Sequence, residues 1–119
     1  MEASSQDIVD EATFEFTMGD HDKAIDLLTQ LIKDDKNCFE AHHALAEIYF
    51  DQGDYKSARE AGEAALKIRE DDIHLHTTMS RIWMESGDKD EAEKHGARAR
   101  VLGWKEQLKS PPDSKDDME

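Results

Sequence analysis

The sequence predicts an all-α protein in which three helix–turn–helix units stack into a solenoid with a short C-terminal cap. The first observation is a repeat: Gly-Asp pairs begin at residues 19, 53 and 87, which are 34 residues apart, and an alanine follows each glycine after five residues. The second is that apolar residues recur at spacings of three and four, the period of a helix with one buried face. The third is that six glycines and two prolines among 119 residues are too few for a flexible linker protein.

The first unit is expected to span about residues 5–38. Ser4, followed three residues later by Asp7, approximates a capping box, so the first helix should begin near Ser5. Glu15 stands where the second unit has Tyr49. A charge can be tolerated at this place because the first helix of an end unit has no preceding neighbour.

The second unit, about residues 39–72, has the clearest helical pattern. Its two helices carry apolar residues on one face each, first at Ala41, Leu45, Ile48 and Tyr49 and then at Ala58, Ala61, Ala65 and Ile68. Between the helices, Gly53 can adopt the left-handed conformation that ends a helix, and the carboxylate of Asp54 can cap the next one. Small residues such as Ala46 and Ala58 allow the two helices to approach closely.

The third unit, about residues 73–106, agrees with the second at matching places, which include Met79, Ser80, Trp83 and Ala99. Gly62 and Gly96 also match, and both stand inside a second helix, where glycine costs about 1 kcal/mol relative to alanine. Because this cost recurs 34 residues later, the sequence predicts a close backbone approach at both glycines.

After Gly103, the spacing of Trp104 and Leu108 predicts a short cap or helical extension in which Trp104 covers the third unit. In the alternative, Trp104 is exposed and marks a site of self-association. Residues 1–109 are thus expected to form one domain. Residues 110–119 are polar, acidic and proline-containing, and a disordered tail is expected there.

Composition excludes several classes of function. The chain has 29 acidic and 15 basic residues and a net charge of −14, which argues against binding to nucleic acid. It has no apolar run long enough to span a membrane, and its N-terminus lacks the features of a signal peptide, so a cytoplasmic location is expected. Cys38 is the single cysteine, which excludes an intrachain disulfide. Residues 1–38 carry a net charge of −7 while residues 73–106 are neutral, so one end is anionic.

The pattern resembles the tetratricopeptide repeat, and the resemblance covers about 100 residues. The residues that carry it are Leu45, Ala46, Tyr49, Gly53, Tyr55, Ala58 and Ala65 in the second unit, Met79, Ser80, Trp83, Gly87, Ala92 and Ala99 in the third, and Ala12, Gly19, Ala24 and Leu28 in the first. The closing proline of the family is absent, and Ile8, His42 and His76 replace its usual tryptophan. The resemblance implies a right-handed superhelical α-solenoid whose first helices line a concave, peptide-binding groove.

The resemblance also assigns residues to this groove. Phe16, Phe50 and Met84 form an apolar row with a spacing of 34 residues, as expected of anchors for an amphipathic or extended peptide. The other partner-binding candidates are Val9, Thr13, His43, Glu47, His74 and Arg81. Glu40, Glu47 and the anionic first units favour a neutral to basic partner, and Arg81 could fix an acidic group at the far end. The clamp that some family members use for acidic chaperone tails is rejected, because its places hold Val9, Thr13, Ala44, His74 and Thr78.

The expected function is therefore a protein–protein interaction adaptor without a cofactor or metal, either a monomer or a weak homodimer. A secretion-chaperone-like holdase is one alternative, since that group is also small, acidic and built of three such repeats. Packing of the groove on another copy of the chain is a second alternative. No phosphate-binding loop, nucleophile elbow or HExxH motif is present, so no enzymatic activity is expected. A metal-dependent enzyme that uses His43, Glu47 and His74 is the alternative from a different class.

Overall fold

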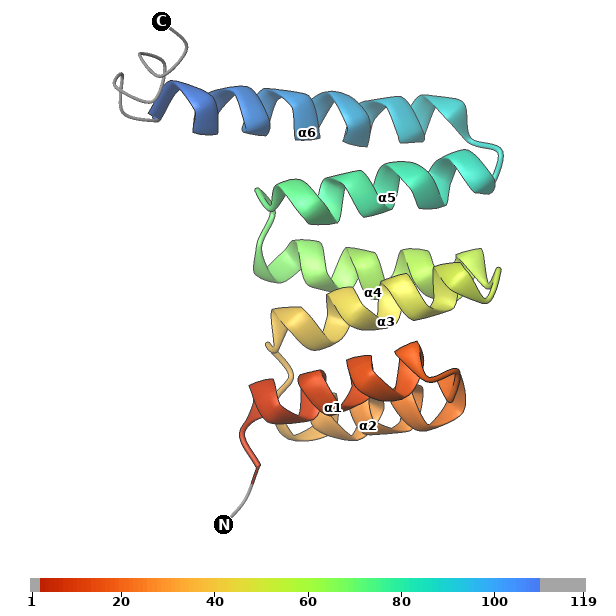
Figure 1. Cartoon of the computed structure of the whole chain (residues 1–119). Helices are drawn as coiled ribbons and strands as arrows, with labels where there is room; N and C mark the ends of the chain where they lie inside the picture. Colours follow the sequence, from red (N-terminus) through yellow and green to blue (C-terminus); the bar gives the residue numbers. More distant parts are fainter. Residues whose placement is uncertain (1–2, 110–119) are drawn as a thin grey trace, which may run out of the picture.

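The computed structural model describes residues 3–109, and this part of the chain consists of helices joined by short turns (Figure 1). The helices are α1 (Ser5–Thr17), α2 (His21–Asp34), α3 (Phe39–Asp51), α4 (Tyr55–Ile68), α5 (Ile73–Glu85) and α6 (Lys89–Lys109). The prediction of an all-α fold is confirmed. The expected disordered tail lies outside the described residues. Within residues 3–109, no helix combines the length and the apolar character needed to cross a lipid bilayer.

Successive helices pack in pairs, α1 with α2, α3 with α4 and α5 with α6, and the three pairs stack in the order of the sequence (Figure 1). The first helices of the pairs touch one another, because α3 contacts both α1 and α5. The second helices α2 and α4 also contact the pair that follows, through α3 and α5 respectively. The arrangement is the helical repeat solenoid that the sequence predicts, with the first and last pairs at its two ends.

The turn inside each pair follows from its Gly-Asp sequence. Gly19, Gly53 and Gly87 have φ values of +94°, +81° and +92°, a conformation that other residues rarely adopt. The aspartates that follow them cap the second helices, with Oδ1 accepting hydrogen bonds from the backbone N–H groups of Lys23, Ser57 and Glu91 at 3.1–3.2 Å. The capping box is also present at Ser4 and Asp7, and α1 begins at Ser5 as predicted.

The apolar core consists of two clusters that each join consecutive pairs. The first cluster contains Leu28 of α2, together with residues of α1 and α3. The second contains Leu75, Met79 and Ile82 of α5, together with residues of α3 and α4. Each cluster depends on a neighbouring pair, as expected for a repeat protein. Helix α6 belongs to neither cluster, although its Ala92 and Leu102 are buried.

Polar contacts supplement the packing of α6 on α5. The hydroxyl of Ser80 donates a hydrogen bond to the carbonyl of Ala92 at 2.8 Å. The Nδ1 atoms of His76 and His95 are 3.0 Å apart, and Nε2 of His76 donates to the carbonyl of Glu70 at 2.7 Å. His76 therefore accepts a hydrogen bond from His95 when both rings are neutral. Burial, followed by the proximity of His76, lowers the pKa of His95, which favours this neutral arrangement.

The predicted close approach at two glycines is found only at Gly62, and there the neighbour is a side chain. A Cβ atom at Gly62 would collide with Sδ of Met79, which lies on the following pair. At Gly96 a Cβ atom would lie 3.4 Å from Oγ of Ser80, which is an ordinary van der Waals contact. The prediction of close backbone approach at both positions is therefore wrong, and only Gly62 makes room for a large neighbour.

The predicted cap is an extension of α6, and the expectation that Trp104 covers the third unit is wrong. Helix α6 continues through Gly103 to Lys109 and has 21 residues, whereas α2 and α4 have 14 each. Trp104 is 65% exposed. The reason is helical phase: Leu102 faces the core, and two further residues turn the helix by about 200°, so Trp104 points away. The exposed tryptophan of the alternative interpretation is what the structure shows.

Candidate partner-binding surface

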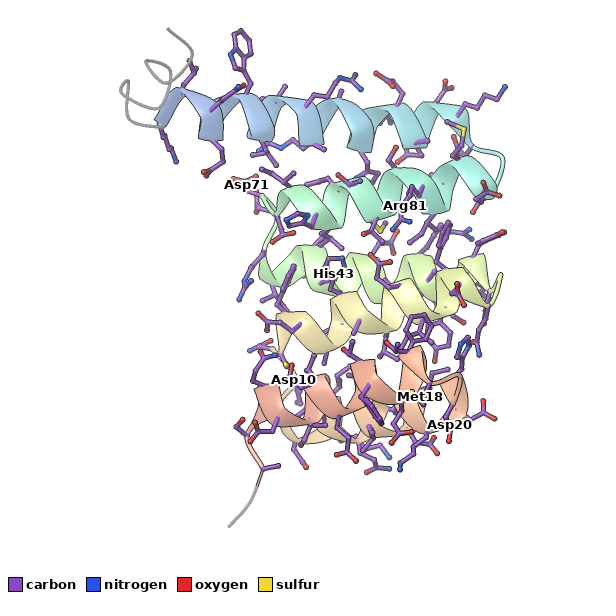
Figure 2. The ribbon with its side chains drawn as sticks, in the orientation of Figure 1. Asp10, Met18, Asp20, His43, Asp71 and Arg81 are labelled. Atoms are coloured by element: carbon purple, nitrogen blue, oxygen red, sulfur yellow. The ribbon has the colours of Figure 1, made fainter. Side chains whose placement is uncertain are left out.

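The nine residues predicted to bind a partner come from the three adjacent first helices. Each helix supplies three of them: Val9, Thr13 and Phe16 on α1, His43, Glu47 and Phe50 on α3, and His74, Arg81 and Met84 on α5. Because α3 lies between α1 and α5, it forms the centre of this surface. Figure 2 labels His43 of α3 and Arg81 of α5 on this part of the molecule.

The apolar row is partly exposed along its whole length. Phe16 and Phe50 are half-buried, and their rings lean on the ring of the first residue of the next helix, at centroid distances of 4.8 Å to His21 and 5.8 Å to Tyr55. Met84 is 50% exposed. These contacts hold the aromatic rings in place while leaving part of each ring accessible to a partner.

A polar network centred on Glu47 connects α3 to α5. Its carboxylate accepts hydrogen bonds from the hydroxyl of Thr78 at 2.7 Å and from Nη2 of Arg81 at 3.2 Å, and Nε2 of His43 lies 3.5 Å away. The hydrogen bond with His43, supported by Thr78 and Arg81, lowers the pKa of Glu47 to about 2 against the opposing effect of burial. Arg81 also lies over the ring of Phe50, at 5.1 Å from its centroid.

This network changes the electrostatics expected from the sequence. The sequence predicts a separate role toward a partner for Glu47 and for Arg81, but in the structure the two side chains form an ion pair. Glu40 of α3 is likewise paired, with Arg69 at 3.1 Å. The centre of the surface is therefore less anionic than its count of carboxylates suggests, and a partner carboxylate would compete with Glu47 for Arg81.

The remaining candidates are placed less favourably for binding. Val9 is only 7% exposed and packs in the first core cluster. Thr13 is exposed, but its hydroxyl donates a hydrogen bond to the carbonyl of Val9. His74 is exposed, and its backbone carbonyl lies 3.0 Å from Oγ1 of Thr78, whose single hydroxyl proton is donated to Glu47.

The metal-site alternative lacks a suitable geometry. It required His43, Glu47 and His74 to converge on one ion, but no group of three potential ligands is arranged to hold a metal within residues 3–109. Thr78 and Arg81 instead occupy hydrogen-bonding sites on the Glu47 carboxylate. The hypothesis of a metal-dependent enzyme therefore finds no site in the described chain.

Replacing Glu47 with glutamine is expected to lower the free energy of unfolding at pH 7 by about 1 kcal/mol, a modest value because the side chain is 41% exposed and screened by water. The lowered pKa means that the native state favours the charged form. The charged Glu47 carboxylate therefore stabilises the folded protein above pH 4.5, and this stabilisation is lost as the pH falls from about 4.5 to about 2. Urea unfolding at several pH values should therefore show the variant and the wild type converging in acid. A difference that stays constant with pH would contradict the role of the Glu47 charge.

A hollow beside the second helices was not predicted from the sequence. It has a volume of about 740 Å³ and is lined by Lys36, Asn37, His42, Glu60, Glu63, Ala64, Lys67 and Ile68. An adjoining hollow of about 380 Å³ also touches His42 and extends to Thr29 and Ile32 of α2 and to Tyr49 of α3. Together they lie between α2 and α4, whose Cα atoms nowhere come within 8 Å of each other.

The small residues of α4 explain this hollow. Ala61 and Ala64 line it, and the residues 34 positions later are His95 and Arg98. In the third pair these larger side chains contact His76 and Asp71. A comparison of the repeats for side-chain size could have indicated the difference. The charges that line the larger hollow are balanced, with Lys36 and Lys67 against Glu60 and Glu63. Charge therefore does not indicate a ligand for this hollow.

Comparisons with known proteins agree with the repeat architecture. Two family models described as tetratricopeptide repeat match the chain, one over residues 9–73 and the other over residues 49–99. No curated protein matches the chain by sequence.

Solved structures show the same fold at low sequence identity. Two crystal structures of MamA superpose with TM-scores of 0.80 and 0.83 and identities of 22% and 23%, and they cover 91% and 88% of this chain. The chain spans 59% and 61% of the lengths of those MamA chains. The second TPR of Spaghetti (RPAP3), solved with the HSP90 peptide SRMEEVD, superposes with a TM-score of 0.78 at 17% identity, covering 82% of this chain and 91% of the other.

Proposed function

Because the chain belongs to the tetratricopeptide repeat family, we propose that it is a protein-interaction adaptor that binds a peptide or helix across α1, α3 and α5. The observation that carries the proposal is the partly exposed apolar row of Phe16, Phe50 and Met84 on three adjacent helices. Apolar anchors at regular spacing suit a partner that presents side chains along one line. The HSP90 peptide bound to the second TPR of Spaghetti (RPAP3) supports peptide binding as a function of this fold.

The partner proposed here is neutral to basic, with apolar side chains that contact the row. The chain has a net charge of −14, so it repels acidic partners at long range and attracts basic ones. The acidic peptide of the RPAP3 structure is not transferred to this chain, because none of the residues at the clamp positions is a lysine or an arginine. Two of them, Val9 and Thr78, are also buried.

Selection of random peptides from a display library on the immobilised wild-type protein tests this proposal. The enriched peptides are then measured against Met84→Glu and Phe50→Glu, and against Thr29→Glu, which places the same charge on an exposed position of α2. Affinity should fall at least about tenfold for the first two variants and stay unchanged for the third. Circular dichroism of every variant checks that the helices are retained.

Peptides that bind all four proteins equally well would place the interaction elsewhere and overturn the proposed surface. A failure to enrich any peptide would also count against an adaptor that recognises linear segments. Enrichment of apolar peptides that share no spacing of anchors would favour the holdase alternative, since a holdase accepts unfolded segments of many sequences.

A further inference from the structure

The C-terminal half of α6 has an apolar strip on the side that faces away from the core. Its members Ala97, Val101, Trp104 and Leu108 are spaced by four, three and four residues, which aligns them along one side of a helix. The last three are 43%, 65% and 69% exposed. We call these four residues the α6 strip. Among the helices, α6 contacts only α5, so nothing in the described chain covers the strip.

The flanks of the α6 strip are basic in an otherwise acidic protein. Residues 97–109 contain four basic residues, Arg98, Arg100, Lys105 and Lys109, and one acidic residue. Arg98 and Arg100 are paired with Asp71 and Glu93 respectively, while Lys105 and Lys109 are exposed. Lys105 and Lys109 are four residues apart and share one flank, so an antiparallel pairing of this strip with the same strip of another copy would bring like charges together. The chemistry instead suits an acidic helix with exposed apolar residues.

Helix α1 presents such a face at the opposite end of the stack. Asp7, Glu11, Phe14 and Met18, which we call the α1 strip, have the same four-three-four spacing and are all exposed. Phe14 and Met18 are 59% and 66% exposed. Residues 5–34 carry eight acidic and two basic side chains. Figure 2 shows Asp10, Met18 and Asp20 on the first helix pair, at the end of the stack away from α6.

The α1 strip corresponds to a packing face of the other repeats. The residues 34 and 68 positions after Asp7, Glu11 and Phe14 are buried: Ala41, Leu45 and Ile48 on α3, and Leu75, Met79 and Ile82 on α5. On α3 these residues belong to the core cluster shared with the preceding pair, as Leu75, Met79 and Ile82 do on α5. Helix α1 therefore exposes the face that its two equivalents bury against a preceding repeat.

We propose that the α1 strip of one copy of this protein docks on the α6 strip of a second copy. Phe14 and Met18 supply apolar contacts for Trp104 and Leu108, and the carboxylates of Asp7 and Glu11 face the basic flank of α6. The helices that carry the two strips, α1 and α6, lie at opposite ends of the stack (Figure 1), so the contact is head-to-tail and leaves one free strip at each end of a dimer. Two single-helix strips bury a small area, so the association is weak and depends on concentration.

Sedimentation equilibrium of the full chain, at about 0.15 M salt and up to about 1 mM protein, tests the proposal. At this ionic strength the screening length is about 8 Å, so charges in contact act more strongly than the overall repulsion between copies. The weight-average mass of the wild type should rise with concentration above the monomer mass of 13.6 kDa. Trp104→Glu and Phe14→Glu should each remain monomeric. An equimolar mixture of the two should form a dimer and nothing larger, because only one intact pair of strips is then available.

Matched controls add the same charge beside each strip. Gln107→Glu on α6 and Thr17→Glu on α1 change exposed residues that are not strip members, and both should associate like the wild type. A wild type that stays at the monomer mass up to about 1 mM would overturn the proposal. So would a mixture of Trp104→Glu and Phe14→Glu that stays monomeric, since head-to-tail docking requires these two variants to complement each other.

Discussion

Replacing Leu75 with alanine is expected to lower the free energy of unfolding by about 3 kcal/mol. Leu75 is fully buried and belongs to the cluster that joins α5 to α3 and α4. Its truncation removes apolar contact and leaves a cavity between the second and third pairs. Because each repeat contacts only its neighbours, this cavity weakens the attachment of the whole third pair.

Urea unfolding followed by circular dichroism measures this effect. Leu108→Ala is the matched control, since it removes the same atoms from a side chain that is 69% exposed, and it should change the free energy of unfolding by less than about 0.5 kcal/mol. The measurement is made at low protein concentration, so that association through the α6 strip does not contribute. Equal losses for the two variants would contradict the assignment of Leu75 to the core.

Replacing Gly53 with alanine is expected to lower the free energy of unfolding by about 1–2 kcal/mol. A Cβ atom at this position meets no atom within 4 Å, so the cost arises from the backbone, whose φ of +81° disfavours any residue with a Cβ. The same substitution at Gly103 is expected to raise the free energy of unfolding by about 0.5–1 kcal/mol. That glycine lies inside α6 with open space around it and lacks a positive φ, so only its poor helix propensity matters.

Thermal and urea unfolding of both variants compare these two glycines directly. The free energy of unfolding is expected to fall for Gly53→Ala and to rise for Gly103→Ala. Because the chemical change is the same, a general effect of adding a methyl group cannot explain both results. Stabilisation by Gly53→Ala would show that this turn does not need a left-handed residue. A large loss from Gly103→Ala would show that α6 is not a continuous helix in solution.

Local chemistry made most of the fold predictable from the sequence. The turns follow from glycines that accept a positive φ and from aspartates that cap the next helix, and both act within a few residues. The end of α6 was not predictable in the same way. Gly103 is compatible with a separate cap and with a helical extension, because glycine inside a helix costs only about 1 kcal/mol and no capping residue or proline follows until Ser110 and Pro111.

The candidate surface was predictable only in part, because its chemistry depends on contacts between repeats. The 34-residue spacing identified Phe16, Phe50 and Met84 as an apolar row, and the structure leaves part of each exposed. The pairing of Glu47 with Arg81 depends on how α5 lies against α3, which no local rule specifies. The hollow depends in the same way on the distance between α2 and α4, which belong to different pairs. It also depends on the absence of large side chains at Ala61 and Ala64.

The uneven linkage of the three pairs gives the solenoid an uneven bending stiffness. Between the second and third pairs, Glu47 bonds to Thr78 and Arg81, and Arg59 bonds to Ser86. At the first joint, which lies beside the hollow, the polar contact is that of His21 with Asp51 at 3.8 Å. Flexing is therefore easier at the first joint, so adjustment to partners of different shape would change the distance from Phe16 to Phe50 more than the distance from Phe50 to Met84.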